Sequence, residues 1–266
     1  MLTEQQHADY SEVGYFIIPK FFSPDEIRAM RSRIEELIQG KHFKKGRRFQ
    51  SYGSADDYGS KGPTPMNYEG PDVSYRKISD LEYDEVYLRI IQKNQLNAIC
   101  SELVDETVSI MRITMMDKPA GGGTHLPWHQ DVSVDWPTTT QPQLTLWFPL
   151  DRATAASGSI QVIPGSHKNG VIDRGHTLPI DLETQYAPEQ KTVTVEVEQG
   201  DCLFFHPALL HRSGINKTDQ PRRAINVILM PGQVIHTKRN KPYPILFGSE
   251  GILRPDEVAR LDAIPV

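Results

Sequence analysis

Two stretches in the first part of the chain carry apolar residues at helical spacing. The first follows Ser23, a residue suited to cap a helix, which is followed directly by proline and, two positions later, by glutamate. Apolar residues then recur at intervals of three and four, which predicts an amphipathic helix over Pro24–Ile38. Residues 14–18 ahead of it have the composition of a short strand, and a second, longer helix is predicted over residues 82–106. The side chains expected to face inward are Ile27, Met30, Ile34, Leu37 and Ile38 in the first helix and Val86, Ile90, Leu96 and Ile99 in the second.

From residue 108 the pattern changes from helical to alternating, as in strands with one buried face. The clearest alternation lies where Val193, Val195 and Val197 are separated by polar residues. Glycine and proline mark the turns between the apolar runs. Strands are predicted over residues 108–116, 143–150, 159–163, 192–197, 202–206 and 224–230.

Helices followed by many short strands favour a mainly β protein, a two-sheet barrel or jelly roll with helices packed outside. The length of 266 residues is compatible with one domain. We expect a helical N-terminal part over about residues 1–106 and a β core over about residues 107–235. Residues 40–80 break both patterns, and a loop of that length is a candidate lid over a site.

Composition narrows the classes of function. The net charge of −5 disfavours nucleic acid or an anionic membrane as the main partner, because both favour basic surfaces. No apolar run has membrane-spanning length, and the first residues do not resemble a secretory signal. With only two cysteines, a disulfide framework is not expected. We therefore expect a cytoplasmic protein, a monomer or homodimer, that acts on a small molecule.

A histidine and a carboxylate stand two positions apart at His129 and Asp131. On an extended backbone both side chains point to the same side and could face one metal ion. Such a pair arises often by chance, so a third ligand is needed. His211, after a later apolar run, can supply it, and His206, five residues earlier on the same stretch, is its rival.

Two imidazoles and one carboxylate on one face of a metal ion are typical of non-haem iron(II) oxygenases, although zinc accepts the same residues. Arg222 follows His211 by eleven residues and begins the next predicted strand. A hairpin return would bring its guanidinium back toward the metal, where its planar set of donors suits a dicarboxylic co-substrate. Arg222 therefore favours iron with 2-oxoglutarate over zinc.

Several motifs, in order, resemble the phytanoyl-CoA dioxygenase family of Fe(II)/2-oxoglutarate-dependent oxygenases. The residues that carry the resemblance are the opening strand and helix and residues 127–131, 158–167, 200–214 and 221–223. The resemblance covers nearly the whole chain and is weakest over residues 40–80. It implies a double-stranded β-helix core of the jelly-roll, cupin-like type.

The resemblance also implies roles for individual residues. His129, Asp131 and His211 would bind Fe(II), and Arg222 would hold 2-oxoglutarate, with Ser213 and Trp147 lining the co-substrate site. Related halogenases have a small residue where this chain has Asp131, so oxygenation by O2 is expected rather than halogenation. Arg212 stands where the family pattern has glycine, next to the substrate pocket.

Further residues are candidates for substrate contact. His125 and Trp136 flank the His129–Asp131 motif, and His167 is expected to stabilise a turn. Residues 41–48 hold five basic side chains, of which Arg47 and Arg48 could meet an anionic substrate, although a solvated loop explains them equally simply.

The expected reaction is hydroxylation of a C–H bond in a small metabolite, with release of succinate and CO2. The same site could carry out demethylation, desaturation or ring formation, or act on an acyl-CoA. A cupin-like metalloenzyme that does not use 2-oxoglutarate and a catalytically inactive binding protein are the alternatives outside this class. The substrate cannot be named, because one fold serves many substrates.

Overall fold

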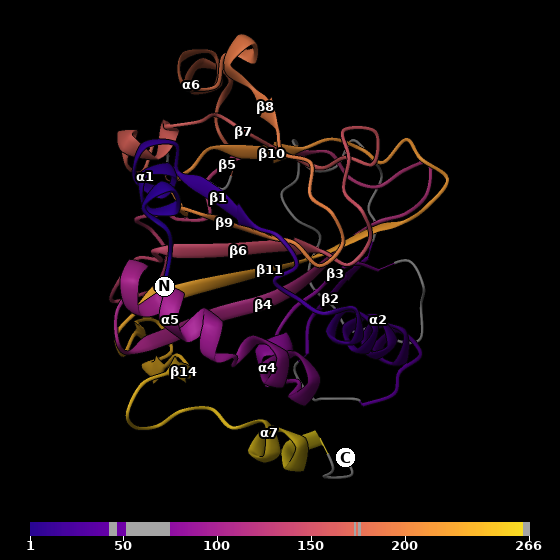
Figure 1. Ribbon diagram of the computed structural model, residues 1–266, viewed down its shortest axis with the longest axis vertical. Helices are drawn as coiled ribbons and strands as arrows, with labels where there is room; N and C mark the ends of the chain where they lie inside the picture. Colours follow the sequence, from indigo (N-terminus) through magenta and orange to yellow (C-terminus); the bar gives the residue numbers. More distant parts are fainter. Residues whose placement is uncertain (43–46, 52–74, 173, 175–176, 263–266) are drawn as a thin grey trace.

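A computed structural model describes residues 1–42, 47–51, 75–172, 174 and 177–262 (Figure 1). Within this range two antiparallel sheets face each other. The larger has eight strands, in the order β1 (Tyr15–Ile18), β9 (Cys202–Phe205), β6 (Leu144–Pro149), β11 (Arg222–Pro231), β4 (Val108–Lys118), β3 (Tyr75–Ile78) and β2 (Phe49–Ser51), with β14 (Ile245–Phe247) also paired to β4. The smaller has the order β5 (Leu126–His129), β10 (His211–Ser213), β7 (Ile160–Val162) and β8 (Val193–Thr194). This arrangement is a jelly roll, as predicted.

Helices cover the outer face of the larger sheet, on the side away from the smaller sheet (Figure 1). They are α2 (Pro24–Ile38), α4 (Glu85–Ile91), α5 (Asn94–Leu103) and α7 (Pro255–Asp262). The remaining helical elements are α1 (Glu4–Glu12) and α6 (Ile180–Tyr186) with the short turns η1 (Leu81–Tyr83), η2 (Ser166–Asn169) and η3 (Glu189–Lys191). A hairpin of β12 (Ile235–His236) and β13 (Lys241–Pro242) lies outside both sheets.

Alternation along β11 divides the interior into two layers. Ile225, Val227 and Leu229 pack in the core that the larger sheet shares with the helices. Ala224 packs with residues of both sheets in the space between them. Because side chains alternate along a strand, Arg222 and Asn226 face that inner space as well. One buried strand therefore holds apolar residues on one face and polar residues on the other.

The predicted elements agree with the structure in most places. Helix α2 has the predicted bounds, and the side chains of Ser23 and Glu26 form the predicted reciprocal cap. Residues 82–106 do not form one helix, which corrects the prediction. Asp84 caps α4, that helix ends at Ile91, and the extended backbone of Lys93 separates it from α5.

Two further expectations about strands were wrong in detail. Only Val193 and Thr194 of residues 192–197 form a regular strand, and Val193 is 40% exposed. Val195 and Val197 are buried as predicted. Arg222 does begin a strand, but not by a hairpin return, because β10 belongs to the smaller sheet and β11 to the larger. Among the described residues, no helix is long and apolar enough to cross a membrane.

Candidate metal centre

His129, Asp131 and His211 come together at the edge of the smaller sheet. His129 is the last residue of β5, and His211, the first residue of β10, is its direct partner in the ladder. The two imidazole rings lie 4.0 Å apart, and each of the three residues is 4% exposed. One ligand atom from each lies within 4.8 Å of the others. This spacing allows all three to bind one metal ion.

Backbone carbonyl groups fix the orientation of both imidazoles. His129 Nδ1 lies 2.8 Å from the carbonyl oxygen of Pro127, and His211 Nδ1 lies 2.9 Å from that of Leu209. A carbonyl oxygen can only accept, so each Nδ1 carries a proton and donates, which leaves Nε2 as the nitrogen that can face a metal. His211 Nε2 lies 3.8 Å from Asp131 Oδ2. Imidazoles oriented in this way through their second ring nitrogen are typical of metal sites.

The Asp131 carboxyl group is held in its ionised form. Burial alone would raise its pKa, but His211, His129, Arg112 and the amide of Asn226 together lower it to about 2. Asn226 Nδ2 donates to Asp131 Oδ2 over 3.1 Å, and an Arg112 nitrogen lies 4.0 Å from Oδ1. The three side chains thus supply two nitrogens and an anionic oxygen, the donor set that iron(II) takes in oxygenases.

His206 lies apart from this group. Its Nδ1 accepts a hydrogen bond from the amide of Ala208 over 3.0 Å, and its ring lies 5.2 Å from that of His167. Burial, with a smaller effect from His167, lowers the pKa of His206 to about 4. His167 Nε2 lies 3.0 Å from the carbonyl oxygen of Ser11. Both side chains therefore pack near the N-terminal helix, and it is His211 that the structure brings to His129 and Asp131.

A pocket adjoins the three residues in the space between the sheets. Arg222 enters it from the start of β11 and is 2% exposed. It donates to the carbonyl oxygen of Gly158 over 3.0 Å, and its guanidinium carbon lies 5.6 Å from the ring centre of Trp147. The lining consists of Arg76, Lys77, Met116, Asp117, Lys118, Thr124, Leu126, His129, Asp131, Trp147, Ile160, His211, Arg212, Ser213, Arg222 and Asn226. The three residues expected around 2-oxoglutarate therefore share one pocket with the candidate ligands.

Glycine at position 158 is required for this arrangement. Its φ of 73° is left-handed, and a Cβ atom there would lie 2.5 Å from the carbonyl oxygen of Gly214. Gly158 accepts the hydrogen bond of Arg222, and Gly214 follows Ser213. The close approach of these two backbones positions both polar side chains.

The sequence analysis missed several polar residues of the pocket, above all Lys118, Lys77 and Asn226. Lys118 donates to the carbonyl oxygen of Thr124 over 2.6 Å, and burial, Arg222 and Arg76 hold its pKa well below the usual value. Burial, Arg112 and Arg76 lower the pKa of Lys77 to about 7. Asn226 could have been found, because it lies four positions after Arg222 on one strand and so shares its face.

His125, Trp136 and Arg212, the other predicted substrate residues, differ in their relation to the pocket. His125 is exposed and is not among the pocket-lining residues, and Trp136 is half-buried beside Arg112, whose guanidinium carbon lies 5.6 Å from its ring centre. Arg212 lines the pocket, yet its guanidinium bonds Gln161 and Glu189 and lies 4.6 Å from the ring centre of Trp128. Their contact with substrate stays a prediction.

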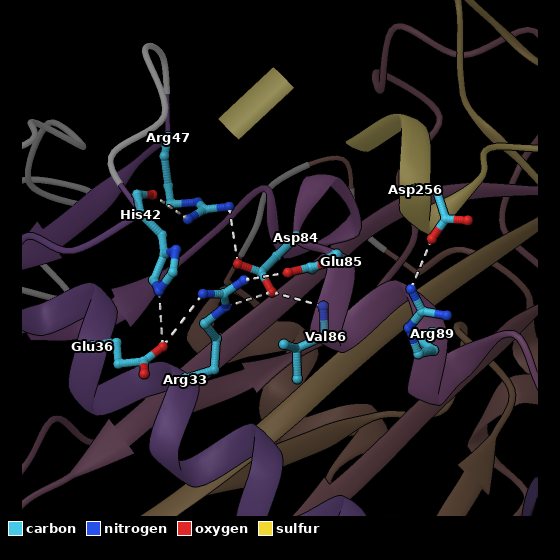
Figure 2. Close-up of polar contacts among 9 residues, drawn as sticks. All are labelled: Arg33, Glu36, His42, Arg47, Asp84, Glu85, Val86, Arg89 and Asp256. Carbon is cyan, nitrogen blue, oxygen red and sulfur yellow. Dashed lines mark hydrogen bonds and ion pairs between the residues drawn. The ribbon is translucent and has the colours of Figure 1, made fainter. Parts of the chain in front are cut away.

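Arg47 and Arg48 each have a carboxylate partner, and Figure 2 shows the one of Arg47. Arg47 is buried and lies 3.4 Å from Asp84, which also pairs with Arg33. Arg48 forms a two-bond pair with Asp80 at 2.9 and 3.1 Å. Neither is among the described residues that line the pocket. The rest of the basic segment, residues 43–46, and most of the candidate lid, residues 52–74, lie outside the described residues.

Comparison with known proteins agrees with this geometry. Residues 10–224 match the model of the family described as phytanoyl-CoA dioxygenase (PhyH). The chain belongs to the phytanoyl-CoA dioxygenase family. A relative in this family, the phytanoyl-CoA dioxygenase of Arabidopsis thaliana, is 25% identical over 252 residues, which cover 85% of this chain and 88% of the relative.

Solved structures share the fold of this phytanoyl-CoA dioxygenase family member. The epimerase SnoN, in complex with Fe3+, alpha-ketoglutarate and nogalamycin RO, has a TM-score of 0.66 at 19% identity and covers 98% of this chain and 90% of its own. EvdO2 of Micromonospora carbonacea, in complex with 2-oxoglutarate, has a TM-score of 0.61 at 20% identity, covering 87% of this chain and 92% of its own. By its family the chain is a 2-oxoglutarate-dependent non-haem dioxygenase, with iron and 2-oxoglutarate as cofactors.

Proposed function

We propose that this enzyme hydroxylates a C–H bond of a small metabolite, with conversion of 2-oxoglutarate and O2 to succinate and CO2. The observation that carries the proposal is the presence of His129, Asp131 and His211 in one pocket with the buried Arg222. Iron with 2-oxoglutarate would supply the oxidising chemistry, and the protein would supply position and a dry enclosure. We also propose that residues 1–266 form one domain, because one buried cluster includes both helices and the larger sheet.

In this proposal the metal ligands are His129, Asp131 and His211. The backbone carbonyls behind the two imidazoles and the Asn226 amide behind the carboxylate would hold these ligands in place. The Asp131 carboxylate would bind the metal where a halogenase binds a halide, which supports oxygenation. No protein acid or base is assigned, because hydroxylation does not require one from the side chains.

Arg222 is the proposed partner of the distal carboxylate of 2-oxoglutarate. A buried guanidinium offers two parallel donors to a carboxylate, and low exposure strengthens such a pair. Trp147 lies beside this guanidinium, and Ser213 contributes a hydroxyl to the same lining. Arg212, which replaces the glycine of the family pattern, borders the same pocket.

Anaerobic titration tests these assignments. Iron(II) with 2-oxoglutarate should give a weak visible charge-transfer band, which Asp131→Ala and Arg222→Ala should abolish or weaken. Arg223→Ala is the matched control, because Arg223 pairs with Asp151 at 2.9 Å instead of lining the pocket. A band that persisted in both pocket variants would overturn the proposed roles.

The substrate is to be sought by succinate release. Several relatives are named phytanoyl-CoA dioxygenases, so acyl-CoA thioesters belong in the screen beside small polar metabolites. Substrate-stimulated release of succinate, with mass detection of the oxidised product, identifies both the substrate and the type of oxidation. Stimulation by thioesters alone would contradict the small-metabolite proposal.

A further inference from the structure

The pocket and its border carry more positive charge than the cofactors can balance. Six basic side chains line or border the site: Arg76, Lys77, Arg112, Lys118, Arg212 and Arg222. The carboxylates beside them are Asp117, Asp131 and Glu189, which pairs with Arg212. The four arginines and three carboxylates leave an excess of one positive charge, to which the two lysines add only the fraction that is protonated. Iron(II) and 2-oxoglutarate carry opposite charges of equal size, so their binding leaves this excess unchanged. Burial first, and the neighbouring arginines second, lower the pKa of Lys77 and Lys118, so neither lysine carries a full charge.

Strand register places Arg112 at one end of the site and the Arg222–Lys118 pair at the other. Lys118 is the partner of Arg222, Thr114 is the partner of Asn226, and Arg112 is the partner of Ile228. Asn226 contacts Asp131 and so marks the level of the metal ligands. At about 3.3 Å per residue, the Arg222–Lys118 end lies about 13 Å from that level, and Arg112 lies about 7 Å from it in the opposite direction. Arg112 is thus separated from the 2-oxoglutarate end by the metal ligands.

Arg112 is also accessible. Its side chain is 24% exposed, whereas Arg222 is 2% exposed. Within the described part of the chain its guanidinium makes no hydrogen bond, and its ion-pair partner, Asp131, lies at 4.0 Å. Asn226 and His211 approach the other oxygen of that carboxylate. A cation that borders the metal site with donors still available is suited to bind an incoming anion.

The surroundings of Arg112 form an aromatic and basic wall. Trp136 lies beside the Arg112 guanidinium. Burial raises the pKa of Tyr243, and the charges of Arg239 and Arg112 partly offset that rise, so both arginines lie near this ring. Backbone hydrogen bonds from Thr139 to Ile235 and from Thr237 to Pro137 join the Trp136 loop to the β12–β13 hairpin. The turn of that hairpin holds Lys238 and Arg239, followed by Lys241, with no acidic residue. An aromatic surface beside a cationic one fits a small organic acid.

We propose that Arg112 binds a carboxylate of the substrate, which is therefore a small organic acid held on the Trp136 side of the metal ligands. This site rests on the proposed function, because its position is defined relative to the metal and 2-oxoglutarate. In an acyl-CoA the acyl carboxyl is esterified and offers no charge to Arg112. The proposal therefore separates a free acid from a thioester.

Relaxation of a small probe tests the site without knowledge of the substrate. The full chain is loaded with Mn(II), a paramagnetic and oxygen-stable substitute for iron(II), and with saturating 2-oxoglutarate, which keeps the probe from Arg222. [13C]Acetate should then show saturable, Mn(II)-dependent relaxation enhancement, and acetamide should show none. Arg112→Gln should weaken acetate binding by about tenfold or more, because the bond to the carboxylate is charge-assisted. Arg112→Lys, which keeps the charge, should lose less.

Controls separate the possible failures. Arg89→Gln removes an exposed arginine of α4 that pairs with Asp256, and it should bind acetate as the unmodified protein does (Figure 2). Failure to bind Mn(II) or 2-oxoglutarate at all would remove the proposed function and this site with it. Intact Mn(II) and 2-oxoglutarate binding with equal acetate and acetamide effects, or with acetate binding unchanged in Arg112→Gln, overturns the Arg112 site alone. Arg112-dependent binding of inorganic phosphate but not of acetate would replace the carboxylate with a phosphate.

Discussion

Asp84 and Asp131 are both buried carboxylates among basic side chains, but their surroundings differ in kind. Asp84 is fully buried, and its two oxygens lie 3.1 Å from Arg33 and 3.4 Å from Arg47, while it also accepts from the Val86 amide (Figure 2). Its charge is balanced within the cluster. Asp131 lies beside two imidazoles, each of which turns its Nδ1 to a backbone carbonyl, and its arginine neighbour lies 4.0 Å away. Burial of charge alone therefore does not mark a functional site, whereas a buried group of side chains whose ligand atoms can all reach one metal ion does.

The closed cluster, which is Asp84 with Arg33 and Arg47, should matter most for stability. Asp84→Ala would leave Arg33 and Arg47 buried without their central counter-charge and would remove the cap of α4. Loss of one partner from a buried ion pair costs about 3–5 kcal/mol. We expect a loss of this size in the free energy of unfolding, measured by denaturant titration, with the metal affinity of the remaining folded protein unchanged.

The matched control for this cluster is Arg89→Ala on the same helix. Its pair with Asp256 is exposed on both sides, so its removal should cost at most about 1 kcal/mol. If Asp84→Ala cost no more than this control, the cluster around Asp84 would not be the closed structural unit that its contacts indicate.

The open cluster is made up of His129, Asp131, His211 and Asn226. Substitutions there should change metal affinity more than stability. Asn226→Ala removes the 3.1 Å hydrogen bond that orients the Asp131 carboxylate and leaves the three ligands in place. Residues that support metal ligands in this way typically contribute about 10- to 100-fold in affinity. We expect weaker Fe(II) binding by that factor in anaerobic calorimetry, with a smaller change in unfolding free energy than Asp84→Ala causes.

Thr145→Val serves as the control for Asn226→Ala. Thr145 lies on the neighbouring strand β6, is buried, and its hydroxyl has no hydrogen-bond partner among the described residues. Its replacement should leave Fe(II) affinity within about threefold, since no ligand depends on it. An equal loss in both variants would mean that general packing, and not the Asn226 amide, holds Asp131.

The sequence predicted the open cluster far better than the closed one. His129, Asp131, His211 and Arg222 lie in motifs whose order and spacing carry the family resemblance, and the jelly roll followed from alternating strands. The sequence predicts that Arg47 meets an anionic substrate or lies in a solvated loop, because no local pattern links it to Asp84, which lies 37 positions away. Ion pairs between distant segments depend on tertiary packing, which periodicity does not encode.

Errors within the predicted elements have local causes. No glycine or proline interrupts residues 82–106, so the sequence predicted one helix. The extended backbone of Lys93 separates two helices instead. The route to Arg222 was misjudged because an apolar run does not reveal which sheet a strand joins. Arg112 was missed because no motif marks it, and its place beside Asp131 depends on the pairing of β4 with β11.

Arg212 lies next to the open cluster in sequence, but its contacts resemble those of the closed cluster. It follows the candidate ligand His211 and replaces the family's glycine, yet its contacts form a balanced set with Glu189, Gln161 and Trp128. Arg212→Gly should therefore cost about 1–2 kcal/mol of unfolding free energy, from a partly exposed ion pair, a cation–π contact and glycine in a strand. Fe(II) and 2-oxoglutarate affinities should change by less than about threefold in calorimetry, and Arg212→Lys should fall between the two proteins in stability. A tenfold loss of Fe(II) affinity with normal stability would instead place Arg212 with the metal ligands. In that case the contacts that balance a buried charge would not be enough to separate structural from functional clusters in this fold.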